Sequence, residues 1–286
     1  MKNPILAVTA AAILVSAGPL GAQFQGPLPS PNAKVVQRIG VTDFTVSYSR
    51  PNVKGRAIWG GLVPWDKPWR TGANAATTFT STDDLEVEGK KLAAGSYSIV
   101  TFPGKESWIV AFNKDLDLWA RTEYDEKKDA LRVTVSPATF PESVETFTIV
   151  FRNVTNDSTE LSFVWEKLRV PVRINVDTKG LVVSKGRAAV AAAKADDWET
   201  PLAVGRTLFN EKLGVPGEAL ALVDKSQSIK KTLGNTALKA RMLAADGKYA
   251  EAVKVGEEAV ALAKASPDKP NIEAFEKALA EWKAKK

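Results

Sequence analysis

Apolar and polar residues alternate along most of the chain between residues 33 and 177. Phe44, Val46 and Tyr48 are separated by polar residues, and the same period recurs at 85–92, where Gly89 predicts a hairpin turn, and at 97–101, 108–112, 131–135, 147–151, 161–165 and 170–176. Successive side chains of a β-strand point to opposite faces, so this period indicates strands with one buried face. We predict nine or ten short strands, with no helix inserted between them, in a two-layer antiparallel β-sandwich or jelly roll over residues 33–178.

A different period begins after Asp177, where alanine becomes frequent and apolar residues recur at helical spacing. Glycine, proline and asparagine divide this part into predicted helices at about 197–212, 216–232, 235–246, 248–265 and 271–284, after an alanine-rich segment at 187–195. The pattern predicts a separate helical domain over residues 186–286. The chain as a whole is predicted to be a segregated α+β protein, with the strands first and the helices second.

Two stretches of the helical part resemble each other at an offset of 33 residues. The heptapeptide that begins at Gly214 aligns with the one that begins at Gly247, and Ser226 then aligns with Ala259. A turn glycine, a bulky residue such as Tyr249 and a small residue at a helix crossing are typical of tetratricopeptide repeats, whose period is 34. We predict tetratricopeptide-like hairpins, and a generic antiparallel pair of helical hairpins is the alternative.

The first 22 residues have the pattern of a secretory signal peptide. Lys2 gives a positive start, an uncharged apolar run extends from residue 5 to 17, and small residues precede Gln23. The apolar run is shorter than the ~20 residues that a membrane-spanning helix needs. We predict a signal peptide at 1–22, an extended leader at 23–32, export to the periplasm or the extracellular space, and no membrane span after cleavage. An uncleaved membrane anchor is the alternative.

The chain contains neither cysteine nor histidine. This composition excludes disulfides, thiolate nucleophiles, imidazole bases and zinc sites built from either residue. Carboxylate, lysine or tyrosine chemistry and oxygen-ligated hard metals remain open, and we favour a non-catalytic protein without a cofactor or a bound metal. The net charge of +6 is spread along the chain, so we predict no nucleic-acid partner.

Residues 50–74 concentrate aromatic and cationic side chains between two predicted strands. Tryptophan offers a flat apolar face with one donor, and arginine offers a planar fork for oxygen acceptors. A glycan or small ligand could therefore bind here, and the candidate ligand-binding residues are Arg56, Trp59, Trp65, Trp69, Arg70 and Asn74. The alternative, which we favour, is that the tryptophans fill the end of the sandwich while Arg70 bonds to loop carbonyls.

Several aspartates lie near predicted turns, but no paired-carboxylate motif stands out. A glycosidase needs two carboxyl groups ~5–9 Å apart, and adjacent residues such as 83–84 would point to opposite faces of a strand. Asp115 and Asp117 indicate a solvated turn rather than a calcium loop, because the longer acidic series is missing. Asp43 and Asp66 are the carboxylates that a hydrolase would use.

A set of linked motifs runs through the predicted sandwich, namely residues 30–40, Tyr48-Ser-Arg-Pro51, Lys54-Gly-Arg56, Gly60-Gly-Leu-Val-Pro-Trp65, Trp69-Arg-Thr-Gly-Ala-Asn74 and Val144-Glu-Thr-Phe147. Over about residues 28–177 the chain resembles a family of exported bacterial proteins known as domain of unknown function 2911. Its members look like secreted or periplasmic β-rich domains, often followed by tetratricopeptide-like helices, so the resemblance implies export and this architecture. It implies no activity or substrate, and its signature positions are Arg50, Arg56, Trp69, Arg70 and Asn74.

The function that we favour is a non-catalytic binding or scaffold module of the cell envelope. Its helical domain would bind a protein partner through a groove, or would dock on the sandwich. One alternative is a carboxylate-dependent glycan hydrolase that uses the 50–74 loop as its substrate platform. A second alternative is a binder of a glycan or small ligand at Trp69, Arg70 and Asn74.

Overall fold

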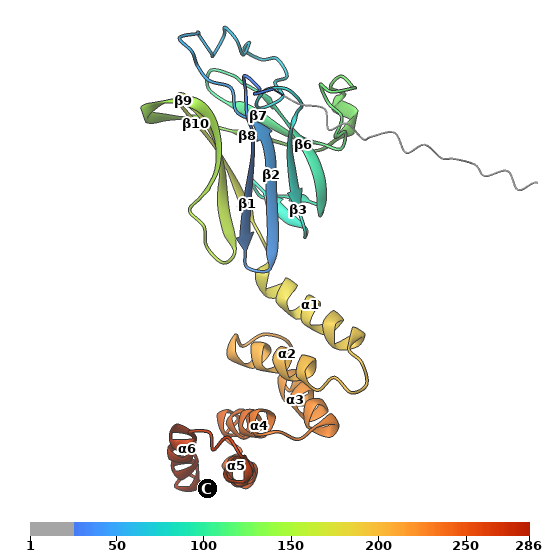
Figure 1. The fold of residues 1–286 in the computed structure, drawn as a ribbon, viewed down its shortest axis with the longest axis vertical. Helices are drawn as coiled ribbons and strands as arrows, with labels where there is room; N and C mark the ends of the chain where they lie inside the picture. The colour runs from blue at the N-terminus through green and yellow to red at the C-terminus, as the bar shows by residue number, and fades with distance from the viewer. Residues whose placement is uncertain (1–25) are drawn as a thin grey trace, which may run out of the picture.

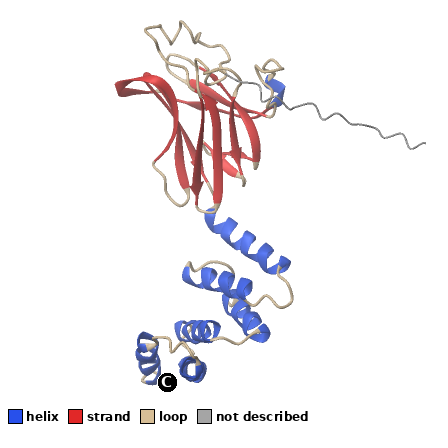
Figure 2. Ribbon diagram, in the orientation of Figure 1, coloured by secondary structure: helices blue, strands red, loops and turns tan. Residues whose placement is uncertain are grey.

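The computed structural model describes residues 26–286, so the predicted signal peptide and residues 23–25 of the predicted leader lie outside the described residues. Within this range the strands come first and the helices follow, as Figures 1 and 2 show. The strands are β1 (Asn32–Ile39), β2 (Thr42–Ser49), β3 (Thr77–Ser81), β4 (Leu85–Val87), β5 (Lys90–Leu92), β6 (Gly95–Phe102), β7 (Trp108–Asn113), β8 (Asp129–Val135), β9 (Ala138–Arg152) and β10 (Ser158–Asn175). The helices are α1 (Thr178–Ala192), α2 (Glu199–Asn210), α3 (Glu218–Ile229), α4 (Leu233–Ala245), α5 (Tyr249–Ala265) and α6 (Glu273–Lys283). This order confirms the predicted segregated α+β fold.

The strands form two antiparallel sheets that share one core. One sheet has the order β1-β2-β3-β6-β7-β8 and the other has the order β5-β4-β10-β9. Phe44 of β2 packs against Phe151 of β9 with ring centroids 5.9 Å apart, and Tyr48 meets Phe147 edge-on. The Tyr48 hydroxyl also accepts the Ile149 N–H at 3.0 Å. Because these contacts cross from one sheet to the other, the strands form a two-layer sandwich, and each buried ring contributes about 1.5–3 kcal/mol.

Strands β4 and β5 form the hairpin that was predicted around Gly89. Val87 pairs with Lys90, so Glu88 and Gly89 are the two turn residues. Their φ angles are 48° and 76°, which is the left-handed backbone that a type I′ hairpin turn requires at both positions. Glycine adopts this conformation at no steric cost. Gly89, which predicted the hairpin from the sequence, is therefore also a residue that allows the turn to form.

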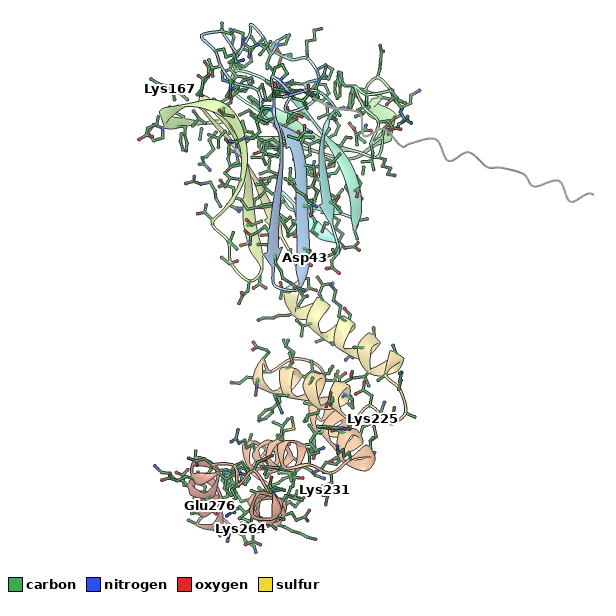
Figure 3. The ribbon with its side chains drawn as sticks, viewed as in Figure 1. Asp43, Lys167, Lys225, Lys231, Lys264 and Glu276 are labelled. Carbon is green, nitrogen blue, oxygen red and sulfur yellow. The ribbon has the colours of Figure 1, made fainter. Side chains whose placement is uncertain are left out.

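Strand β10 doubles back on itself. A straight strand of this length would extend about 60 Å, yet the N–H of Val176, just after the strand, donates to the carbonyl of Asp157, just before it, at 2.8 Å. The bend lies near Glu166, which has a φ of 49° and a shifted register with β9 on both sides. Figure 3 shows the neighbouring Lys167 at the end of the sandwich opposite to Asp43. The sequence pattern predicted two strands here, and the bend is the point that separates them.

The segment between β7 and β8 covers part of the outer face of the six-stranded sheet. Leu118 is buried there against Val100 of β6 and Ala111 of β7. A single 3-10 turn, η1 (Glu126–Lys128), follows, and the Asp125 side chain stabilises it by accepting the Lys127 N–H at 3.0 Å. The expectation that no helix interrupts the strands was therefore wrong at η1. A single 3-10 turn is too short to produce a helical period in the sequence.

Helix α1 begins where β10 ends. The Asp177 side chain caps the helix by accepting the Gly180 N–H at 3.0 Å. The Thr178 hydroxyl donates to the Asn156 carbonyl at 2.6 Å, which fixes the first turn to the hairpin between β9 and β10. Residues 179–185, which the sequence pattern left between the two predicted domains, belong to this helix. The helix leads away from the base of the sandwich, and the other helices follow it (Figure 1).

The remaining helices form two hairpins, α2–α3 and α4–α5, followed by α6. Gly214 and Gly247, which align in the internal repeat, both have left-handed backbone, with φ angles of 80° and 76°. Ser226 and Ala259, the aligned small residues, are both 0% exposed. The two hairpins therefore place equivalent residues in equivalent positions, and their membership of the tetratricopeptide class stays a prediction. Within residues 26–286, no helix is long and apolar enough to cross a membrane.

Candidate functional site

Trp59 and Trp69 of the predicted loop pack onto the core at one end of the sandwich. The Trp59 ring lies 5.1 Å from that of Trp108 and 5.9 Å from that of Trp165, edge-on in both cases. Trp69 stacks on Trp165 at 5.9 Å and meets Phe147 edge-on at 5.3 Å. Trp108 and Trp165 are each 1% exposed, so the half-buried loop tryptophans close over fully buried rings. Each aromatic pair adds about 0.5–1.5 kcal/mol beyond the burial of its surface.

The sheet and the loop's own side chains fix the loop backbone. Trp69 and Thr101 of β6 exchange two backbone hydrogen bonds, at 2.8 and 2.9 Å, and the Trp69 indole donates to the Gly72 carbonyl at 3.1 Å. Gly60 has a φ of 79°, and it lies so close to the ring of Trp65 that a Cβ at this position would overlap the ring. Trp59 and Trp69 are thus held by packing on the core, while Trp65 lies against the backbone of Gly60.

The arginines of the loop donate to nearby carbonyl groups. Arg56 donates from its Nη2 to the Asn52 carbonyl at 2.5 Å. Arg70 donates to the Asn74 carbonyl, and its guanidinium lies 5.4 Å from the ring centre of Trp119. A cation over a tryptophan face contributes about 0.5–1 kcal/mol at an exposed site. Arg70 therefore joins the 50–74 loop to the segment that covers the outer face of the sheet.

Two further signature residues tie the loop to the start of the chain and to the second sheet. Asn74 donates from Nδ2 to the Ser30 carbonyl and to the Ser49 hydroxyl, both at 3.1 Å. Arg50 donates to the carbonyl of Phe147 in β9 at 3.1 Å. These contacts support the structural interpretation of the loop. A ligand-binding role stays a prediction for the six candidates, Arg56, Trp59, Trp65, Trp69, Arg70 and Asn74.

Asp43 and Asp66, the carboxylates of the hydrolase alternative, lie at opposite ends of the six-stranded sheet. Asp43 is at the start of β2, where its carboxylate lies 3.5 Å from Arg38. The Asp66 N–H donates to the carbonyl of Pro103, the residue after β6. Strands β2 and β6 both pair antiparallel with β3 and so run in the same direction. The start of one strand and the end of the other are far apart, so these two carboxylates do not flank a common bond.

Asp115 and Asp117 form the turn that was predicted for them. Asp115 pairs with Lys128 at 2.7 Å and accepts the Asp117 N–H at 3.0 Å. The Lys128 bond lowers the pKa of Asp115 below its ordinary value. In the part of the chain that the structure describes, no three Asp or Glu side chains gather closely enough to hold a metal ion.

The helical domain contains a groove of about 650 Å³ between α4 and the start of α6. Its apolar lining comes from Leu233 and Ala237 on α4 and from Ile272 and Phe275 at the start of α6. Phe275 is buried and the other three side chains are partly exposed. Leu233 and Ala237 are four residues apart, so they share one face of α4. We name this feature the helical groove.

Charged side chains border the helical groove. Arg241, one turn beyond Ala237, places its guanidinium 5.7 Å from the ring centre of Phe275. Lys277 and Glu273 are exposed and also line the groove. The sequence pattern predicted a groove in this domain but named none of these residues. The four-residue spacing of Leu233, Ala237 and Arg241 was the one available signal.

The fold and these sites define a segregated α+β protein, in which an antiparallel β-sandwich is followed by a set of helical hairpins. The chain belongs to the family described as protein of unknown function (DUF2911), whose model matches residues 30–174, just over half of the chain. The match confirms the family resemblance carried by the sequence motifs. It spans β1 to β9 and all but the last residue of β10, so the helices lie outside it. No curated protein and no solved structure matches the chain.

Proposed function

We propose that this protein is an exported binding module of the cell envelope and that its helical groove holds a segment of a partner protein. The observation that carries this proposal is the apolar lining of the groove, which is open between α4 and α6 and bordered by Arg241 and Lys277. Clefts with apolar walls and a few convergent polar groups are the usual form of a binding site.

The chemistry of the groove limits the partner. The partly exposed Leu233, Ala237 and Ile272 suit an apolar side chain, which would be the central anchor of the interface. Two cations against the single carboxylate of Glu273 favour a neighbouring acidic side chain on the partner. The partner segment therefore combines an apolar anchor with at least one Asp or Glu.

One feature of the sequence supports an envelope location, and a second supports binding rather than catalysis. Residues 1–22 have the positive start, the short apolar run and the small-residue end of a secretory signal. The absence of cysteine and histidine removes thiolate nucleophiles and imidazole bases, which favours binding over catalysis. The sandwich would then serve as the stable body that carries the helical domain.

A co-purification experiment with two charge-reversal variants tests the proposal. The tagged chain and its Arg241→Glu and Arg206→Glu variants are purified from the envelope fraction, and co-purifying proteins are quantified by mass spectrometry. Arg206 is exposed on α2 and lies outside the groove, which makes it the matched control. We expect at least one co-purifying protein to fall tenfold or more with Arg241→Glu alone. Equal profiles for all three chains, with unchanged melting curves, would contradict the proposal, and retention of the chain in the cytoplasm would contradict export.

A further inference from the structure

A second cleft lies on the β-sandwich, away from the 50–74 loop and from the helical groove. It has a volume of about 550 Å³ and is formed by β10, the end of β8, the turn before β10 and the β4–β5 turn. Its polar lining includes Glu88, Thr134, Asn153, Ser158, Glu160 and Arg173. We name this feature the polar cleft.

The polar cleft exists because β10 doubles back. The hydrogen bond between Val176 and Asp157 returns the end of the strand to its beginning. Glu160 alternates with the buried Leu161, and Arg173 alternates with the buried Val172, so both charged side chains lie on the outward face. Residues that are distant within one strand are thereby brought to the same cleft.

The carboxylate of Glu160 is held in a fixed position at this cleft. Its Oε1 accepts the Ser162 hydroxyl at 2.5 Å and also a bond from Arg169. Burial raises the pKa of Glu160, but the bonds from Ser162 and Arg169 lower it more, so that the pKa lies below its ordinary value. The group is therefore ionised at neutral pH, and both of these bonds are to Oε1, which leaves Oε2 as an acceptor for a ligand.

Glu88 and Arg173 supply a second carboxylate and a guanidinium. Oε1 of Glu88 accepts the backbone N–H of Arg173 at 2.5 Å, which anchors the β4–β5 turn against β10. Both side chains are exposed and line the cleft. The cleft thus combines carboxylate acceptors with the five N–H donors of a guanidinium.

The balance of charges identifies the ligand class. Glu160 forms an ion pair with Arg169, while Glu88 and Arg173 add one carboxylate and one guanidinium to the lining, so the formal charges of these four groups sum to zero. Hydroxyls of Thr134 and Ser158 add weaker donors and acceptors, while Pro171 and Val135 add apolar surface. Paired acceptors and donors beside a small apolar wall suit a neutral molecule with many hydroxyl groups. We propose that the polar cleft binds a neutral saccharide of one or two sugar units, because its volume lies in the range of small-ligand sites.

Calorimetric titration of the full chain tests this site. The probes are cellobiose, maltose and N,N′-diacetylchitobiose, and the variants are Glu160→Gln and Arg173→Met. Glu142→Gln is the control, since Glu142 is an exposed residue of β9 outside the cleft. We expect at least one disaccharide to bind, with a Kd at least tenfold weaker in each cleft variant and unchanged in the control.

Two outcomes would overturn the inference. One is that none of the three disaccharides binds at millimolar concentration. The other is that the Arg173→Met chain binds as tightly as the natural chain. Arg173→Met leaves the Glu160–Arg169 pair intact, so it reports on the cleft even where Glu160→Gln alters folding. The saccharide titration does not depend on the helical groove. The saccharide proposal and the partner-binding proposal can therefore fail separately.

Discussion

The ammonium group of Lys185 lies 2.6 Å from the carboxylate of Asp83, and this ion pair joins α1 to the base of the sandwich. Lys185 also donates to the Val41 carbonyl at 3.0 Å, and Asp83 accepts the hydroxyls of Thr42 and Thr82 at 2.9 Å each. Burial raises the pKa of Asp83, but its bonds to Lys185 and the two hydroxyls lower it more, so the pKa lies below its ordinary value. The pair therefore holds α1 against the base of the sandwich.

Replacing Lys185 by methionine should loosen the junction without unfolding either part. The side chain is 44% exposed, so the loss of stability should be about 1 kcal/mol or less. Small-angle scattering should show a broader distribution of interatomic distances, because α1 is then held by fewer contacts. Lys179→Met, an exposed position on the same helix, should leave the scattering unchanged. Identical curves for all three chains would show that this ion pair does not set the junction.

Acid should weaken the contact between α1 and α3. Arg187 donates to both carboxylate oxygens of Glu218, at 2.7 and 2.9 Å, and these bonds lower the pKa of Glu218 to about 2. The pKa in the unfolded chain is higher, about 4.3. The contribution of this group to stability is therefore complete above about pH 4.3 and is lost as the pH falls toward 2. Thermal unfolding across this range should show a smaller pH dependence for Glu218→Gln, and an unchanged pH dependence would contradict the assignment.

Truncating Trp69 should destabilise the sandwich far more than truncating Arg56. Trp69 is half-buried and contacts buried rings on both sheets, so Trp69→Ala should cost a large part of the about 3–5 kcal/mol that a fully buried aromatic loses on truncation. Arg56 is exposed and bonds to neighbouring carbonyls, so Arg56→Ala should change the free energy of unfolding by about 0.5 kcal/mol or less. Urea denaturation, monitored by tryptophan emission, measures the free energy of unfolding of both variants. A folded Trp69→Ala chain of natural stability would mean that the loop is not part of the core.

A larger side chain at the repeat position should disturb the helical domain. Ala259 is 0% exposed and packs with Ala240 of α4 and Phe275 of α6. Ala259→Leu should therefore cost about 1–3 kcal/mol through overpacking. Ala261→Leu, on the exposed face of the same helix, should cost about 0.5 kcal/mol or less. The helical transition is followed by far-ultraviolet circular dichroism, and equal effects of the two variants would argue against close packing at this crossing.

The sequence predicted the strands well because their alternation is set by local geometry. Phe44, Val46 and Tyr48 point into the core as their spacing requires, and Gly89 marks a turn by its own backbone freedom. The first half of α1 was missed, because Gly180 and the β-branched valines at 182–183 are poor helix formers. The capping residue Asp177 was the signal that could have located the start of the helix.

The two clefts depend on long-range geometry, and local patterns contain little information about it. Alternation marks Glu160 and Arg173 as outward-facing, but only the return of β10 places them at one cleft. The helical groove likewise requires α6 to pack beside α4, which the spacing within either helix does not specify. The 50–74 loop was identified because its composition is unusual, and Trp59 and Trp69 pack on the core.

The central claim is that the partner protein binds in the helical groove and not at the tryptophan-rich loop. Site-specific photo-crosslinking in intact cells tests it most directly, with a photoreactive residue at Lys277 in the groove or at Leu62, which is 47% exposed in the loop. We predict a discrete crosslinked product from position 277 and none from position 62. A product from position 62 with none from position 277 would contradict the account.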